Sequence, residues 1–133
     1  MKDLYNNLQV RASLTVATRT NGTVNGTAVD RNYNGSMFHS VLCVVHTGTM
    51  TDGSVAVTVE ESDDNSAWAT ATALQGTAPT VAASDDDKVY EIGYLGGKRY
   101  VRVKAVTTGA TSGGVFGATV ILGDPRVAPV VRP

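Results

Sequence analysis

The chain has 133 residues, of which 17% are charged and 42% are hydrophobic, and its formal net charge is −1 at pH 7. This length is typical of one domain, which can bury roughly two-thirds of its unfolded surface without a disulfide or a metal. The near-neutral charge and the scattered cations argue against direct nucleic-acid binding, for which a basic stripe is expected. No run reaches the roughly 18 apolar residues of a membrane span. The start also lacks an apolar run of signal-peptide length, so we expect the protein to be made and assembled in a cytosol.

Short runs rich in Val and Thr, separated by Gly, Asn and Asp clusters, predict β-strands packed as a sandwich or barrel. Residues 11–20 are the first predicted strand, with Leu14 and Val16 on one face. The Asn-Gly pair at 21–22 predicts a turn after it, because both residue types tolerate a positive φ. Residues 37–47 are the most apolar run and predict a central strand that is buried on both faces.

The second half of the chain shows clear alternation between apolar and polar residues. Residues 53–61 place their valines on one inward face, and residues 67–74 are the predicted return strand. Residues 88–94 and 99–107 alternate in the same way, and the Gly-rich segment 95–98 predicts a hairpin turn between them. The last predicted strand covers residues 115–122.

The two ends of the chain differ from the strand-rich middle. Residues 124–133 contain three of the four prolines, and proline cannot donate to a β-ladder. This composition predicts an extended C-terminal arm over residues 124–133, and residues 1–9 are a predicted second arm. The β domain is therefore expected to cover residues 10–123.

His39, Cys43 and His46 share the apolar predicted strand and could suggest a catalytic pair or a metal site. Alternation along a strand places His46 on the face opposite His39 and Cys43. The latter two share a face but are separated by about 13 Å, whereas a nucleophile and its base must approach within about 3 Å. We therefore expect no catalytic residue, no metal ligand, no cofactor and no enzymatic activity.

Two acidic segments, residues 60–65 and 85–87, collect carboxylates at predicted turns. Neither segment has the spacing of a helical calcium loop, so solvated turns are the expected structure, and cation binding stays open. Aromatic residues could line a sugar-binding face, although half-buried positions in a sandwich are the more ordinary interpretation. These aromatic residues are Trp68, Tyr90, Tyr94 and Tyr100.

Three segments together resemble small structural proteins of tailed-phage genomes. They are residues 57–68 (Val-Thr-Val-Glu-Glu-Ser-Asp-Asp-Asn-Ser-Ala-Trp), residues 96–103 (Gly-Gly-Lys-Arg-Tyr-Val-Arg-Val), and residues 120–126 followed by the Pro-rich tail. Their order and spacing are similar over residues 36–133 to the head decoration (cement, capsid-stabilising) proteins of tailed bacteriophages. The first 35 residues carry little of this resemblance.

The resemblance implies an all-β fold, a single-domain jelly-roll-like antiparallel β-sandwich with extended N- and C-terminal arms. It implies a homotrimer on the capsid exterior of a virion, with the major capsid protein as its partner and no cofactor. Terminal arms of such proteins reach neighbouring subunits, which places the expected partner-binding residues in the tail: Pro125, Arg126, Val127, Pro129, Val130, Val131 and Arg132. Two alternatives stay open, a carbohydrate- or receptor-binding module of a virion and a tail-tube or head-tail joining subunit.

Overall fold

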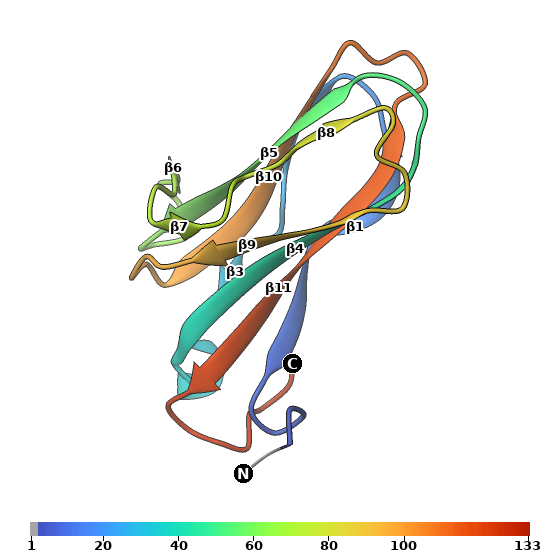
Figure 1. The fold of residues 1–133 in the computed structure, drawn as a ribbon. Helices are drawn as coiled ribbons and strands as arrows, with labels where there is room; N and C mark the ends of the chain where they lie inside the picture. Colours follow the sequence, from blue (N-terminus) through green and yellow to red (C-terminus); the bar gives the residue numbers. More distant parts are fainter. Residues whose placement is uncertain (1–2) are drawn as a thin grey trace.

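The computed structural model describes residues 3–133 and consists of two antiparallel β-sheets packed face to face (Figure 1). Within this range the one helix is a 3-10 turn, Tyr33–Gly35, and no helix there is long and apolar enough to cross a membrane. The strands in chain order are β1 (Gln9–Arg19), β2 (Gly22–Asn25), β3 (Val29–Asp30), β4 (Phe38–Met50), β5 (Ser54–Ser62), β6 (Ala69–Thr70), β7 (Leu74–Gln75), β8 (Thr80–Ala82), β9 (Val89–Tyr94), β10 (Tyr100–Thr108) and β11 (Gly114–Pro125).

The strand order is that of a jelly roll. One sheet, which we call the β4 sheet, has the order β1-β11-β4-β9-β7. The other, the β5 sheet, has the order β2-β10-β5-β6, with β3 beside β10 and β8 beside β5. The pairs are nested along the chain: β1 pairs with β11, β2 and β3 with β10, β4 with β9, and β5 with β6 and β8. This nesting confirms the expected all-β, jelly-roll-like antiparallel sandwich.

Nested pairing moves the chain between the sheets at most connections, and this overturns two predictions. Residues 95–98 are not a hairpin turn, because β9 lies in the β4 sheet and β10 in the β5 sheet. The predicted return strand at 67–74 is likewise wrong as one strand. It is divided between β6, which pairs with β5, and β7, which begins at Leu74 and pairs with β9. Alternation tells which residues face inward, but not which sheet holds them.

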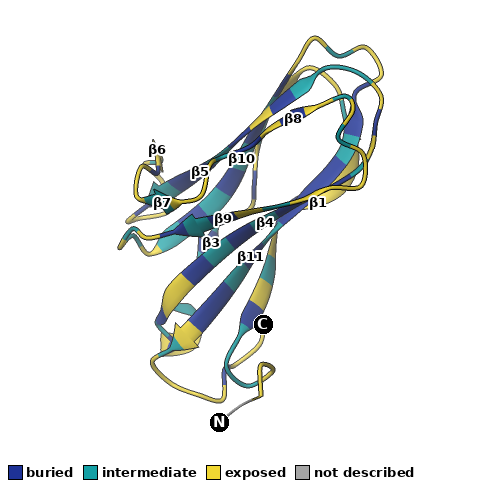
Figure 2. Ribbon diagram, viewed as in Figure 1, coloured by how far each residue is buried: buried dark blue, intermediate teal, exposed yellow. Residues whose placement is uncertain are grey.

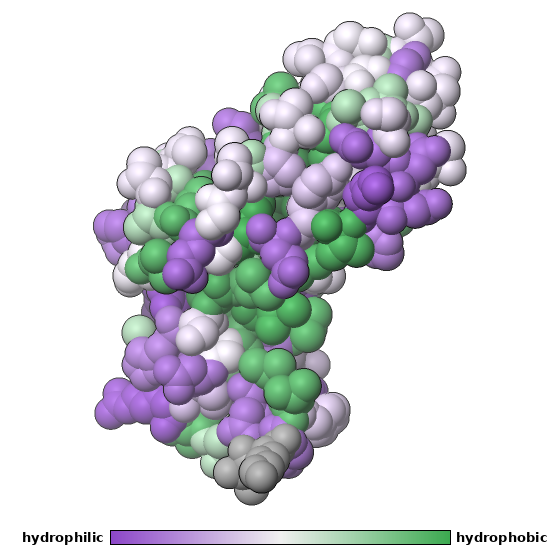
Figure 3. Space-filling model, viewed as in Figure 1, coloured by the Kyte–Doolittle hydropathy of each residue, from purple (hydrophilic) through white to green (hydrophobic). Residues whose placement is uncertain are grey.

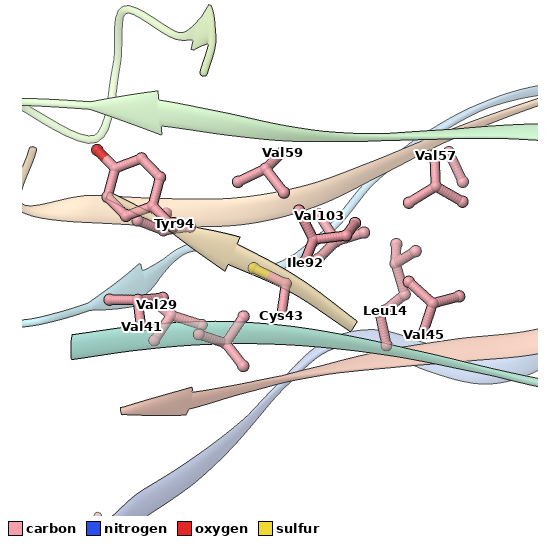
Figure 4. Close-up of a cluster of buried hydrophobic side chains, with 14 of the residues drawn as sticks. Leu14, Val29, Val41, Cys43, Val45, Val57, Val59, Ile92, Tyr94 and Val103 are labelled. Atoms are coloured by element: carbon pink, nitrogen blue, oxygen red, sulfur yellow. The ribbon is translucent and has the colours of Figure 1, made fainter. Parts of the chain in front are cut away.

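The core lies between the two sheets and is built from alternate strand residues, as the striped colouring of Figure 2 shows. The inward valines of β5 and β10 are fully buried, as their alternation predicts. Figure 4 shows core side chains of both sheets pointing toward one another, among them Val57, Val59, Val103, Cys43, Val45 and Ile92. Burial of each such valine or isoleucine contributes about 1.5–3 kcal/mol, so this layer is the main source of stability.

Strand β4 is buried on one face only, which corrects the prediction of burial on both. Val41, Cys43 and Val45 face the core, whereas Leu42 and Val44 on the opposite face are half-buried. The prediction fails because the described chain supplies two layers, and no third layer covers the outside of the β4 sheet. Consequently an apolar strand face is left at the surface.

Strand β1 also departs from its prediction. Leu14 is buried, but Val16 is 75% exposed, so the two residues do not share a face. The register against β11 shifts between Ala12 and Leu14 and again before Ala17, which breaks the alternation. The first shift places Ser13 inside next to Leu14, where its hydroxyl accepts a hydrogen bond from the Val103 amide.

The two ends do not extend from the body as separate arms. The Val130 amide donates to the Asn6 carbonyl at 3.0 Å, and the Gln9 side-chain amide donates to the Val131 carbonyl at 2.7 Å. The Val130 side chain is buried and belongs to the core cluster. We call residues 3–9 and 126–133 the terminal clasp. Met1 and Lys2 of the predicted N-terminal arm lie outside the described residues.

A buried arginine bridges two segments of the chain at the end of β4 that lies near the terminal clasp. The Arg31 side chain is almost fully buried, and its guanidinium donates to four carbonyl oxygens at 2.9–3.2 Å, those of Phe38, His39, Gly96 and Lys98. Burial lowers the pKa of this guanidinium. Since these oxygens lie on the first two residues of β4 and on the β9–β10 crossing, Arg31 fixes one crossing point between the sheets.

Replacing this arginine provides a test of the fold. Arg31→Met should lower the free energy of unfolding by about 3 kcal/mol, because several buried carbonyl oxygens lose a charged donor. Urea unfolding followed by circular dichroism measures the change. The matched control is Arg99→Met, which removes a solvent-exposed ion pair with Asp30 and should cost less than about 1 kcal/mol. Equal losses in the two variants would contradict the role of Arg31.

Candidate interaction surface

The structure keeps His39, Cys43 and His46 apart. Cys43 is fully buried, and this burial raises the pKa of its thiol to about 12. His39 is exposed at the end of the strand, where its Nδ1 lies 3.1 Å from the Asp124 carbonyl. The register of β4 against β11 is regular from Phe38 to Cys43, yet His39 is exposed and Cys43 is buried, so the two side chains have different surroundings. His46 is exposed on the outer face of the sheet.

The acidic segment 60–65 forms a turn whose carboxylates already have partners. Asp64 accepts hydrogen bonds from the amides of Ser66 and Ala67, both at 2.9 Å. Asp63 forms an ion pair with Lys98 at 2.6 Å. Across residues 3–133, no group of three or more His, Cys, Asp or Glu side chains is placed to hold a metal ion.

The carboxylates at the opposite end of the sandwich bind backbone amides of loops. Asp86 accepts from the Met50 amide at 2.7 Å, and Asp85 accepts from the Ala82 amide at 2.9 Å. Asp52 accepts from three successive amides, those of residues 111–113. These hydrogen bonds, above all the one from Gly113, hold the pKa of the Asp52 carboxyl below its usual value. The function of these acidic groups is to fix loop conformation.

The aromatic side chains do not gather into an open sugar-binding face. Tyr94 is buried, and Tyr90 and Tyr100 lie on different sheets. The Trp68 ring is covered by the Arg102 guanidinium, which lies 4.1 Å from its centre. That guanidinium is held in turn by the carboxylate of Glu60 at 2.7 Å, so the exposed part of the ring is small.

The expected partner-binding residues of the tail have different surroundings. Val130 is buried, Pro125 is half-buried at the end of β11, and the remaining tail residues are exposed: Arg126, Val127, Pro129, Val131 and Arg132. The Arg132 guanidinium donates to the carbonyls of Tyr5 and Leu8 and lies over the Tyr5 ring. The tail is therefore anchored through some of its residues and presents others, in particular Val127 and Val131, to solvent.

Sequence reasoning missed the largest apolar surface, which is the outer face of the β4 sheet. Strand register aligns its residues in rows across four strands, β1, β11, β4 and β9. One row is Val10, Ile121, Leu42 and Gly93, and the next is Ala12, Thr119, Val44 and Glu91. A third row on β11, β4 and β9 is Gly117, His46 and Val89. We call this surface, together with Leu8, Val16 and Val115, the outer apolar face.

Side chains at the ends of β1 extend this face over glycines of β11. A Cβ at Gly117 would lie 2.8 Å from the Val16 side chain, and a Cβ at Gly123 would lie 2.9 Å from the Leu8 side chain. Glycine at these two positions therefore lets a neighbouring apolar side chain lie close to the backbone. The result is a surface of apolar ridges and shallow hollows.

The outer apolar face carries few charges. Glu91 and His46 are the ionisable residues of its three rows, whereas the outer face of the β5 sheet holds Glu60, Arg102 and Lys104 in one ion-pair cluster. Figure 3 shows a hydrophobic band that runs over β4, β11 and β1, with hydrophilic residues on both sides. Contiguous apolar surface of this kind marks an interaction site in a folded protein.

The face continues into the terminal clasp. A hollow of about 440 Å³ lies between them, lined by Leu4, Tyr5, Leu8, Val10 and Arg132. Among the described residues, five of the eight exposed large hydrophobic side chains belong to the face or this hollow: Leu4, Tyr5, Val10, Val16 and Val89. The apolar run 37–47 was the signal that could have indicated this surface. The run is apolar on both faces of the strand, and a two-layer sandwich can cover only one of them.

The fold and this surface define the class of the protein as a jelly-roll β-sandwich with one largely apolar outer face. No protein-family model matches the sequence, and no curated protein matches it. Among solved structures, the PBSX exported protein XepA is similar over 100% of this chain, with a TM-score of 0.61 and 21% sequence identity. The similarity covers 42% of the XepA chain, so this chain spans less than half of that protein's length. The structure of PirA is similar with a TM-score of 0.43 and 11% identity, over 93% of this chain and 99% of that one.

Neutralising Asp52 provides a pH test of the loop anchors. The pKa of its carboxyl is lowered in the folded state, so its contribution to stability is present above the unfolded pKa of about 4 and is lost as the pH falls through the folded pKa. Asp52→Asn should therefore lower the melting temperature at neutral pH, and its curve should converge with the native curve toward about pH 2. Asp87→Asn removes an exposed carboxylate nearby and is the control. A difference between native and Asp52→Asn chains that does not change with pH would contradict the charged anchor.

Proposed function

We propose that the chain is a non-enzymatic structural protein of a phage virion. It binds the outside of the assembled capsid and stabilises the capsid by bridging copies of the major capsid protein. The observation that carries this proposal is the outer apolar face and its continuation into the terminal clasp, since a surface of this kind acts through contact. Two further observations favour a phage setting: the sequence resemblance over residues 36–133, and the fold shared with XepA, a phage PBSX exported protein.

The physical mechanism is linkage. A protein that binds the closed lattice and not the free subunits stabilises the lattice by RT ln(1 + [L]/Kd). A homotrimer, which the resemblance implies, would present three equivalent contacts to the lattice. Simultaneous contacts raise the effective affinity by about 10²–10⁴ without any new kind of interaction. Weak individual contacts are then sufficient for full occupancy of the capsid.

The tail is the surface that we assign to the capsid. Val127 and Val131 are 57% and 50% exposed, although Val130 between them is buried and fixes the backbone. The hydrogen bond from Arg132 to the Leu8 carbonyl at 2.9 Å holds the end of the tail. A segment that is ordered before binding loses less conformational entropy when it meets its partner, which favours affinity.

The two alternatives have less support from the geometry. A carbohydrate- or receptor-binding module would need accessible aromatic faces, and Arg102 covers the ring of Trp68 while Tyr94 is buried. A tail-tube or head-tail joining subunit would form rings of a symmetry that electron micrographs of the virion can distinguish from a surface decoration. Binding on a glycan array that is lost in Trp68→Ala would favour the first alternative.

A double variant of the tail provides the test of capsid binding. The variant Val127→Asp with Val131→Asp places charges on the presented side chains and leaves the buried Val130 in place. We expect binding to weaken by at least about tenfold, since burial of a single valine contributes roughly a factor of ten to the affinity. The measurement is co-sedimentation with shells assembled from the major capsid protein of the same genome.

The matched control is Thr23→Asp with Ala56→Asp, which adds the same charge to exposed positions of the β5 sheet. Capsid occupancy that is unchanged in the tail variant would remove the tail from the mechanism. A native chain that does not bind the shells at all would overturn the proposed function. Deletion of residues 125–133 is a less specific test, because it removes both the end of β11 and the buried Val130.

A further inference from the structure

We infer that the outer apolar face is a self-association surface, which is buried against the same face of a neighbouring copy of this chain. The residues that carry the inference are Val10, Ile121, Leu42 and Val44, which share two adjacent rows of the β4 sheet, with Val16 and Val89 at the flank. The inference goes beyond the proposed function, because a face that packs on the same face of another copy joins two subunits, whereas the homotrimer is implied by the resemblance alone.

The chemistry of the face fits a second copy. Interfaces between identical subunits are more apolar than other interfaces, and their centres are depleted of charged residues. Across its three rows the face has Glu91 on strand β9 and His46, while its central positions are valine, leucine, isoleucine, threonine and alanine. A partner recognised by charge would find no complementary group at the centre. A second copy brings the same uncharged central positions, so no unpaired charge is buried at the centre of the contact.

The size of the face fits a stable interface. Four strands about 4.8 Å apart give a width of about 19 Å, and residues 8–16 at about 3.3 Å each give a length of about 27 Å. The flat footprint is therefore about 500 Å², at the upper end of the largest apolar patch on a typical monomer. Two such footprints bury about 1,000 Å² in total, which is the lower limit for a specific interface between proteins.

The shape of the face favours packing of sheet on sheet. Two β-sheets pack about 10 Å apart when side chains of each enter spaces in the other. Here ridges formed by Val16, Leu42 and Val44 border two shallow hollows, one lined by Gly117 and the other by Gly93. The same ridges and hollows on a neighbouring copy can interdigitate with them. The arrangement repeats between subunits the packing that already joins the two sheets within one subunit.

The sheet edges are less suitable for joining copies. Strand β1 is one edge of the β4 sheet, and its two register shifts against β11 interrupt a regular ladder. At the other edge β7 covers β9 opposite Gly93 and Tyr94. Irregular and covered edges oppose strand addition to the β4 sheet.

The test is the molar mass in solution, measured by size-exclusion chromatography with light scattering. The native chain should run as a dimer, because a face that packs on the same face of another copy forms a two-fold contact with one partner. The double variant Val10→Asp with Val16→Asp should run as a monomer with an unchanged β-type circular-dichroism spectrum, because both side chains are exposed in the single chain and are not needed for its folding. We expect self-association to weaken by at least about a hundredfold, since two charges would have to be buried without partners. The control is Thr23→Asp with Ala56→Asp, which should keep the native mass.

Each result has a definite consequence. A monomeric native chain, or an oligomer that persists in Val10→Asp with Val16→Asp, would overturn the inference. If the native chain is a monomer and the same variant loses binding to capsid shells, the face belongs to the capsid protein; the inference then fails and the proposed function stands. An oligomer that is broken by the variant but never binds shells would support the self-association surface and defeat the proposed function.

Discussion

The structure depends on one constraint: two sheets bury one face each against the other, and nothing in the described chain covers a second face. Nested pairing produces this arrangement, because it places the successive long strands β4, β5, β9, β10 and β11 alternately in the two sheets. Every inward valine is thereby covered by strands from distant parts of the chain. The packing of this layer, with Cys43, Val59 and Val103 near its centre, supplies most of the apolar burial that opposes conformational entropy.

The same constraint explains why the two outer surfaces differ. On the β5 sheet, Arg102 and Lys104 surround Glu60 and make the outside of the sheet polar. On the β4 sheet, strand β4 carries apolar residues on both of its faces. The outward residues, including Leu42 and Val44, are therefore left at the surface. The two outer surfaces of the sandwich therefore differ in polarity. This difference suits a protein whose partners lie on one side of it.

Polar side chains fix the connecting segments that lie outside the hydrophobic core. Arg31 bridges the start of β4 and the β9–β10 crossing through backbone carbonyls, and Asp52 binds the amides of the loop before β11. The terminal clasp works in the same way at the chain ends, where Gln9 and Arg132 bind carbonyls that proline-rich backbone could not pair in a ladder. Each of these hydrogen bonds is made to a backbone group. It therefore fixes the path of the main chain and depends little on which side chains are nearby.

The sequence by itself determined the long strands and most of their inward residues. Alternation is a local property with a period of two residues, so Val55, Val57 and Val59 could be assigned to the core from the sequence alone, and so could Val101 and Val103. The tertiary structure decided what depends on distant partners: the sheet that holds each strand, the crossing at 95–98, the outward face of β4 and the return of the tail onto the N-terminal segment. A local pattern carries no information about which distant strand becomes its neighbour. For the same physical reason the outer apolar face became visible only when β1, β11, β4 and β9 were aligned side by side.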